Sequence, residues 1–262
     1  TNDRGAITSD LGDRNPERFQ IYSDIGVNPA GGVNYVPGDK LGDVEGIMTY
    51  YGGLWELIPT VAPAPAVGMQ VSRDVTTLAG GDAHLTVGAY NLENISPTDP
   101  AAKFTALAHD ITFNLNAPDI LGVEEIQDNN GTGTGVLASD VTLNMIVDAI
   151  LAAGGPRYAW VVIDPTAHNA SGGEPNGNIR NAILYNPERV DYVAGSVRHI
   201  SDNTPLDGDG YRNGRKPIVA DFMFHGEQVT FVGVHNYSRL GSDELFGQNQ
   251  PPFISGDPRR TD

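Results

Sequence analysis

Polar side chains follow two apolar, β-prone runs in the first half of the chain. The run 85–90 leads to Asn91, and the run 120–123 ends on two adjacent carboxylates, Glu124 and Glu125. Because the carboxyl ends of neighbouring strands meet at one rim of an α/β sheet, where such sheets hold their sites, this rim is the candidate site. A solvated turn after a buried strand is the alternative interpretation.

The segment between the two runs predicts how they are connected. Apolar residues recur with a helical period over 101–115, so the stretch reads as strand, helix and strand, a unit that suits a crossover within one sheet. Side chains alternate along a strand, so only one of Glu124 and Glu125 should point to a given face. Both faces of the run are apolar, so the period does not choose between the two carboxylates.

The strings YNLEN and DILGVEEIQD resemble the first two motifs of the DNase-I-like endonuclease/exonuclease/phosphatase superfamily. The resemblance implies that Asn91 orients the partner of Glu125 or the attacking water, and that Glu125 holds a divalent metal. Mg²⁺ or Mn²⁺ is expected, bound through oxygen, with Ca²⁺ as an alternative structural ion. Glu124 stands where Gln is usual. The resemblance runs from about Asp82 to the last residue and is greatest to the secreted bacterial extracellular nucleases.

A third motif lies in the string IRNAILYNPERV, which resembles the superfamily strand in which an Ile-Arg pair precedes an apolar run ending in Tyr-Asn-Pro. The resemblance implies that Arg180 binds the substrate phosphate and that Tyr185 lies near the scissile phosphate. A core tyrosine is the alternative for Tyr185. Asn178 stands where the superfamily normally has Asp, and His168 is expected to be a solvated loop histidine.

The most specific stretch spans residues 215–252. Two β-prone runs, Ile218–Phe224 and 228–234, flank a turn and predict a hairpin whose second strand leads to His235. The strings GSDELFG and QPP that follow resemble those of the secreted nucleases, and the alignment places the superfamily histidine on His235. The resemblance implies that His235 binds or protonates a phosphate oxygen.

The superfamily continues with a strand ending in Gly-Asp-x-Asn and a terminal Asp-His pair, and neither string occurs in the 262 residues. The chain is therefore expected to be truncated at both ends relative to the superfamily, with its acid–base groups supplied from beyond residue 262. The unpaired sheet edge that truncation leaves should promote self-association.

The first part of the chain predicts a separate small β module over residues 1–78, followed by the nuclease-like domain over 79–262. The module resembles the later part of an OB-like domain, and an all-β spacer is the alternative. OB folds stack bases on aromatic side chains, and Tyr50, Tyr51 and Trp55 are available for that, although a core position is favoured for Trp55.

Composition narrows the class of protein. The formal net charge is −17, which argues against avid binding of nucleic acid unless divalent cations or a salty extracellular medium offset it. The absence of cysteine excludes disulfides and thiolate metal sites, and no apolar stretch approaches the ~20 residues of a membrane span.

A further amphipathic helix is expected over 138–153, with Ser139 or Asp140 as its N-cap.

Together these features predict an α/β two-sheet sandwich of DNase-I-like type, incomplete at its C-terminus and preceded by a partial OB-like module. The function implied by the resemblance is that of a secreted bacterial metal-dependent phosphodiesterase that hydrolyses DNA or RNA. The alternative is a catalytically inactive fragment with a structural or adhesive role in an extracellular assembly.

Overall fold

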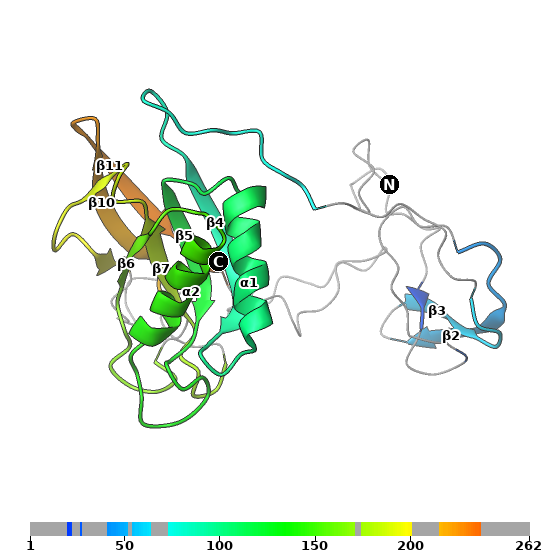
Figure 1. Ribbon diagram of the computed structural model, residues 1–262. Coiled ribbons are helices and arrows are strands. Elements are labelled where there is room, and N and C mark those ends of the chain that lie inside the picture. The colour runs from blue at the N-terminus through cyan, green and yellow to red at the C-terminus, as the bar shows by residue number, and fades with distance from the viewer. Residues whose placement is uncertain are drawn as a thin grey trace. The chain divides into compact units, whose positions relative to one another are not determined.

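The computed structural model describes residues 20–22, 27, 41–51, 54–63, 73–170, 174–200 and 215–236. The chain divides into two compact units, one containing the described residues up to 63 and the other those from 73 onward. Each unit is built around its own sheets (Figure 1). The boundary lies a few residues before the one expected at 78.

Contacts with the first helix explain why residues 73–78 belong to the second unit. The guanidinium of Arg73 forms an ion pair with Asp110. The Thr76 amide donates to the Asn114 carbonyl at 2.8 Å, and the Asn116 side chain donates to the Leu78 carbonyl at 2.9 Å. These bonds depend on residues about 40 positions away in the sequence, which local composition does not reveal.

The first unit holds a three-stranded sheet of β1 (Gln20–Ile21), β2 (Gly46–Tyr51) and β3 (Leu54–Pro59), in the order β1-β3-β2. Strand β2 is antiparallel to β3, and β1 is parallel to it. The core position favoured for Trp55 is wrong, because 59% of the residue is exposed. Trp55 pairs across the strands with Tyr50 on an exposed face, their rings edge to face at 5.2 Å. The OB-like assignment of this module stays a prediction.

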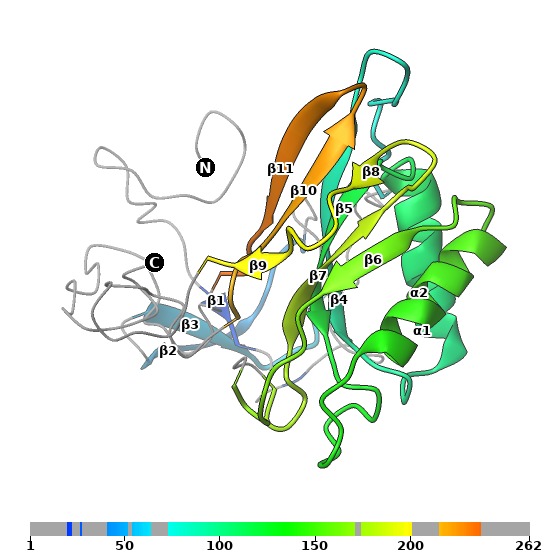
Figure 2. The ribbon, with the colours of Figure 1, turned by 90° about the vertical axis from the view of Figure 1, so that its left-hand side faces the viewer.

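The second unit begins with a four-stranded sheet covered by helices. The strands are β4 (Val87–Ile95), β5 (Ile120–Ile126), β7 (Arg180–Tyr185) and β6 (Ala159–Val162), in that order, with β4 parallel to β5 and the other pairs antiparallel. The helices α1 (Ala101–His109), its π-helical continuation η1 (Asp110–Asn114) and α2 (Asp140–Ala152) lie on one face (Figure 2). Both helices were expected from the apolar period. No helix in the described part of the chain is long and apolar enough to cross a membrane.

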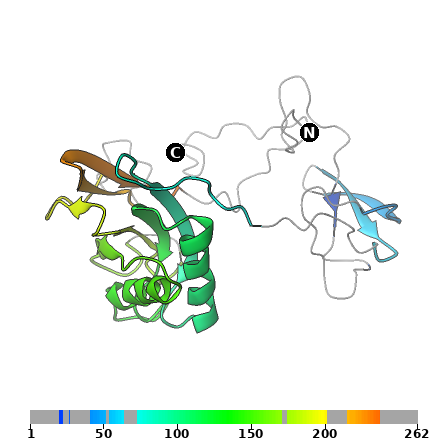
Figure 3. The ribbon, with the colours of Figure 1, turned by 45° about the horizontal axis from the view of Figure 1, so that its top comes forward.

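A second sheet packs against the other face of the first. It contains β11 (Glu227–Gly233), β10 (Ile218–Phe224) and β8 (Asp191–Tyr192) in that order, and β9 (Arg198–His199) also pairs with β10. Figure 3 shows the orange β10–β11 hairpin and the green helices on opposite sides of the first sheet. The expected α/β two-sheet sandwich is therefore confirmed in the described part of the chain. The expected hairpin is confirmed as well, and its turn residues His225 and Gly226 have φ of 50° and 84°, as a type I′ turn requires.

The alternation of β5 divides the core into two layers. Leu121 and Val123 face the helices, where they join the buried side chains of α1 and α2, and Ile120 faces the second sheet. Gly122 also faces the second sheet, and a Cβ built on it would lie 2.9 Å from the ring of Phe231 on β11. The absence of a side chain at Gly122 thus allows the two sheets to approach each other.

The N-terminus of α2 is capped from a distant loop. Ser139 occupies the N-cap position, but its side chain makes no capping hydrogen bond there. The Asn129 side-chain oxygen instead accepts from the amides of Val141 and Thr142 at 2.9 and 3.3 Å. The expected local cap at Ser139 or Asp140 is therefore replaced by a tertiary contact.

Replacing Gly122 with valine should destabilise the second unit by about 1–3 kcal/mol, because the added methyl groups must displace Phe231. Urea unfolding followed by circular dichroism measures the change. A Gly122→Val/Phe231→Leu double variant should recover part of the loss, since leucine vacates the space that the ring fills. An unchanged unfolding midpoint in Gly122→Val would contradict this packing.

Candidate active site at the carboxyl ends of β4 and β5

The carboxyl end of β5 contains one residue more than the segment of β7 that pairs with it. Val123 pairs with Ala182 and Ile126 pairs with Arg180, so three steps along β5 match two along β7. The extra residue lies at Glu124–Glu125, and Glu125 has a left-handed backbone with φ 63°. Such a bulge redirects side chains from the regular alternation of a strand.

The carboxyl end of β4 is irregular at the same level. Asn91 pairs with Glu124 and Ile95 pairs with Ile126, so four steps along β4 match two along β5. Glu93 and Asn94, inside this irregularity, also have left-handed backbones, with φ of 54° and 56°. Left-handed residues other than glycine are costly and cluster at functional sites, so this rim has the backbone character of a site.

The side chains of the two strand ends interact with each other. The Asn94 amide donates to a Glu125 carboxylate oxygen at 2.9 Å, and the Asn91 side-chain oxygen accepts from the Glu93 amide at 2.8 Å. The Asn91 side chain is also hydrogen-bonded to the Glu124 carboxyl group. Asn91 therefore links the ends of the two strands. The orienting role that the resemblance implied for it stays a prediction.

His235, two residues past the end of β11, reaches the same rim from the second sheet. Its Nε2 lies 3.9 Å from a Glu124 carboxylate oxygen and 3.6 Å from a Glu125 carboxylate oxygen. Its Nδ1 is buried and has no hydrogen-bond partner in the described part of the chain. The structure thus brings together Asn91, Glu124, Glu125 and His235, which we call the rim cluster.

Burial and nearby charges set the protonation of the rim cluster. Burial, reinforced by the charge of Glu125, raises the pKa of Glu124, and Arg215 and Asn91 partly oppose that shift. Burial and the charge of Arg215 lower the pKa of His235 to about 4, with Glu125 acting in the other direction. His235 is therefore neutral at pH 7.

Arg215 is a functional candidate that the sequence analysis did not single out. It is buried, it donates to the Asn236 carbonyl at 2.6 Å, and its charge acts on both Glu124 and His235. It lies just before β10, and only the pairing of β10 with β11 brings it near a histidine 20 residues later in the chain. A lone arginine before a β-prone run carries no local signal of this placement.

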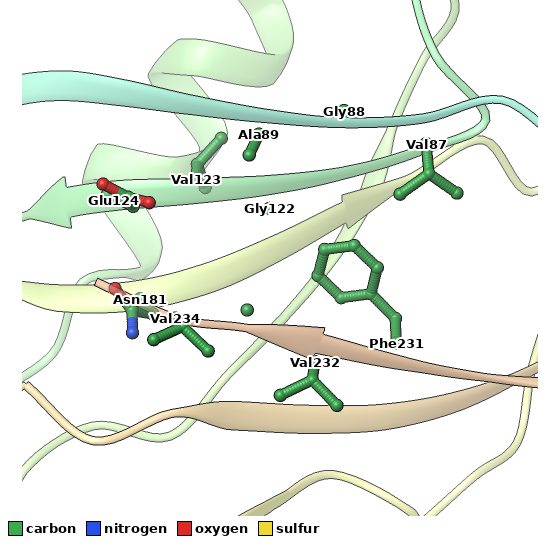
Figure 4. A pocket seen from close by; sticks show the side chains of 11 residues that line it. Val87, Gly88, Ala89, Gly122, Val123, Glu124, Asn181, Phe231, Val232 and Val234 are labelled. Atoms are coloured by element: carbon green, nitrogen blue, oxygen red, sulfur yellow. The ribbon is translucent and has the colours of Figure 1, made fainter. Parts of the chain in front are cut away.

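A cavity of about 400 Å³ opens beside the rim cluster, between the β4–β5 pair and β11. Figure 4 shows Glu124 and Asn181 at one end and Val87 and Phe231 at the other. Asn181 is 5% exposed, and its side-chain nitrogen donates to the Lys216 carbonyl at 3.1 Å. Apart from Glu124 and Asn181, the lining is apolar or glycine.

Arg180 lies at the same end of the sheet, but its guanidinium is committed to buried contacts. It is 3% exposed and ion-paired with Asp128 and Asp164. It also donates to the carbonyls of Asn178 and Leu137, at 3.0 and 2.8 Å. Its role as a ligand of the substrate phosphate stays a prediction.

The structure does not bring Tyr185 to the rim cluster. Strand β7 runs antiparallel to β5, so Tyr185 at its carboxyl end pairs with Ile120 at the amino end of β5. From Ile120 to Glu124 is roughly 13 Å along the strand, at about 3.3 Å per residue. Tyr185 packs between the sheets, 5.3 Å from the ring of Phe222 and 5.9 Å from that of Tyr192, which is the position of a core tyrosine.

His168 is not a solvated loop histidine, because its side chain is only 25% exposed. Its Nε2 accepts a hydrogen bond from the Gly135 amide at 2.9 Å. Its Nδ1 lies 3.2 Å from the Asn178 side-chain nitrogen and 3.8 Å from an Asp128 carboxylate oxygen. The expectation fails because the loop folds back onto the end of β5, a contact between residues distant in sequence.

The rim cluster fits a divalent cation through its oxygens. Among the described residues, no group of three or more His, Cys, Asp and Glu side chains is arranged as a complete metal site. Mg²⁺ uses only one or two protein carboxylates and keeps several waters, so a complete protein cage is not required. Burial, reinforced by the charge of Glu125, raises the pKa of Glu124, and a cation bound beside it would favour the ionised carboxylate.

A family model described as a domain of unknown function (DUF8508) matches residues 1–69. No curated protein matches the sequence.

The chain is also similar to solved structures, at low identity. A humanized D. rerio TDP2 with 14 mutations is 14% identical, with a TM-score of 0.36, over 59% of this chain and 51% of that chain. D. rerio TDP2 complexed with single strand DNA product is 14% identical, with a TM-score of 0.36, over 59% of this chain and 46% of that chain. An endonuclease/exonuclease/phosphatase family protein from Leptotrichia buccalis C-1013-b is 12% identical, with a TM-score of 0.35, over 61% of this chain and 56% of that chain. The chain thus spans about half the length of these structures.

The protonation of His235 predicts a pH dependence of stability. The pKa of the imidazole is about 4 in the folded protein and 6.5 in its ordinary state. Between these values the unfolded chain binds a proton that the folded protein excludes, so the free energy of unfolding should rise with pH over this range. Urea unfolding at several pH values should show a shallower rise for His235→Gln than for the parent. Equal slopes would show that His235 titrates normally.

Proposed function

We propose that the protein is a metal-dependent phosphodiesterase of the endonuclease/exonuclease/phosphatase kind, hydrolysing DNA or RNA. One observation carries the proposal, namely the convergence of Asn91, Glu124 and Glu125 with His235 at one rim. The sequence motifs that resemble those of the superfamily supply three of these residues, Asn91, Glu125 and His235. The fourth, Glu124, stands in place of the usual Gln.

Glu125 is the residue that would hold Mg²⁺ or Mn²⁺, with Glu124 beside it. A divalent cation held there would supply Lewis-acid polarisation of a phosphoryl oxygen and positive charge against the charge that develops during hydrolysis. The hydrogen bond from the Asn94 amide fixes one Glu125 oxygen, and the other carboxylate oxygen faces His235. Asn91 forms a hydrogen bond with the Glu124 carboxyl group and would help to orient it.

His235 and Arg215 would act on the substrate phosphate. The neutral imidazole of His235 forms a hydrogen bond with a phosphate oxygen, and the negative charge of a bound phosphate raises the histidine pKa from its depressed value. Arg215 supplies positive charge to a rim that is otherwise acidic. Groups of this kind, fixed before substrate arrives, stabilise the charge of the transition state.

The net charge of −17 restricts how the substrate is bound. Long-range attraction of a polyanion is unfavourable, so binding should depend on the cation at the rim and on contacts other than phosphates. The exposed edge-to-face pair of Tyr50 and Trp55 supports base stacking as such a contact in the first unit. A secreted location fits the resemblance and the acidity, since salt outside the cell screens the repulsion.

Plasmid nicking by the protein at its native length, in Mg²⁺ and in chelator, tests the proposal. Glu125→Gln should lower the Mg²⁺-dependent rate by more than about 100-fold, beyond the loss typical of residues that only orient a metal ligand. Glu188→Gln, which removes the same charge from an exposed loop, should keep the parent's rate.

Loss of nicking in chelator, and its recovery with Mg²⁺ or Mn²⁺, are expected from the parent. If the folded protein neither cleaves DNA or RNA nor binds Mn²⁺, the proposal that it is an enzyme is wrong, and the inactive structural or adhesive role is favoured. Sedimentation of the same sample would then show whether β11, which pairs only with β10 in the described part of the chain, mediates self-association.

A further inference from the structure

A single guanidinium joins four segments of chain at the carboxyl end of the first sheet. Arg180 donates to Asp128 after β5, to the Leu137 carbonyl before α2, to Asp164 after β6 and to the Asn178 carbonyl before β7. These bonds use four of the five N–H groups that an arginine has. Its side chain is 3% exposed, so the guanidinium is withdrawn from solvent.

The carboxylates that receive Arg180 are themselves held in place. Asp128 is completely buried, and its second oxygen accepts from the Asn178 side chain at 2.7 Å. Asp164 accepts from the Ser139 hydroxyl at 2.7 Å. The pair of Arg180 with Asp128 is buried and rigid, because displacing Arg180 would leave the buried Asp128 charged and without this counterion, whereas the Asp164 side chain is 37% exposed.

The position of Arg180 in the sheet connects this network to the site. Its backbone pairs with Ile126, the residue that ends the bulge at Glu124–Glu125. Regular pairing of Val123 with Ala182 defines the other side of the bulge. Asp128 lies two residues past Ile126, so its bond to Arg180 fixes the chain just after the bulge.

We propose that Arg180 is a positioning residue that holds the β5 bulge, and hence Glu124 and Glu125, in the geometry of the rim cluster, rather than a ligand of the substrate phosphate. The proposal rests on the proposed function, because it takes the rim cluster as the catalytic site. A phosphate could reach this guanidinium only by displacing Asp128 or Asp164. The structure therefore gives Arg180 an indirect role through the two aspartates.

Arg189, four residues past the carboxyl end of β7, offers a control at the opposite end of the first sheet. Its guanidinium is paired with Asp119, immediately before β5, at 2.8 Å, and donates to the Gly81 carbonyl at 2.7 Å. Arg180→Lys and Arg189→Lys each replace an ion-paired, hydrogen-bonded arginine with a cation that cannot form the same fork of bonds. Only the first lies at the bulge.

Hydrogen exchange of the Asn94 amide reports the bulge without requiring activity, because this amide donates to the Glu125 carboxylate. Arg180→Lys should speed its exchange by at least about 10-fold relative to the parent, and Arg189→Lys should leave it unchanged. Asp164→Asn, which removes one arm of the network, should give a smaller change in the same direction and serves if Arg180→Lys does not fold.

Mn²⁺ affinity and nicking kinetics supply the functional readouts. Arg180→Lys should weaken Mn²⁺ binding by roughly 10- to 100-fold, as residues that orient metal ligands do, and lower kcat with little change in KM. A raised KM with unchanged Mn²⁺ affinity and unchanged Asn94 exchange would overturn the proposal and identify Arg180 as a phosphate ligand. If the parent protein neither binds Mn²⁺ nor nicks DNA, the proposed function fails. Hydrogen exchange of the Asn94 amide then decides by itself whether Arg180 holds the β5 bulge in place.

Discussion

The extra residue at the carboxyl end of β5 is the constraint on which the candidate site depends. A regular strand sends successive side chains to opposite faces, so Glu124 and Glu125 could not both approach one group. The left-handed backbone of Glu125 breaks this alternation and leaves both carboxylates within 4 Å of the His235 Nε2. The second sheet must then bring its own strand end to the same level, which the β10–β11 hairpin does.

This arrangement is unfavourable in isolation and must be held by its surroundings. Each left-handed residue other than glycine costs about 1–2 kcal/mol, and three of them lie at the ends of β4 and β5. Two adjacent carboxylates repel each other, and this repulsion adds to burial in raising the pKa of Glu124. The hydrogen bond from Asn94, the charge of Arg215 and the buried network of Arg180 oppose these costs. A cation at the rim would remove the repulsion, which connects the strained backbone to the proposed chemistry.

Local pattern determined much of the fold. The apolar period of 101–115 led to a helix packed on the sheet, and the β-prone runs around His225 led to a hairpin. Asn91, expected where its strand ends, lies within β4, which continues to Ile95. The placement of His235 just past a strand did follow from the sequence, because it needs only the run that precedes the residue. Such features depend on neighbours a few positions away in the sequence, so the spacing of apolar residues is enough to predict them.

Only the tertiary structure decided how those elements combine into a site. The sequence could not choose between Glu124 and Glu125, since a bulge depends on register against β7 rather than on the residues of β5. The antiparallel direction of β7 placed Tyr185 at the far end of the sheet and Arg180 at the near end. Burial against Asp128 then turned Arg180 away from solvent. Each outcome depends on contacts between residues far apart in the chain, which no local pattern encodes.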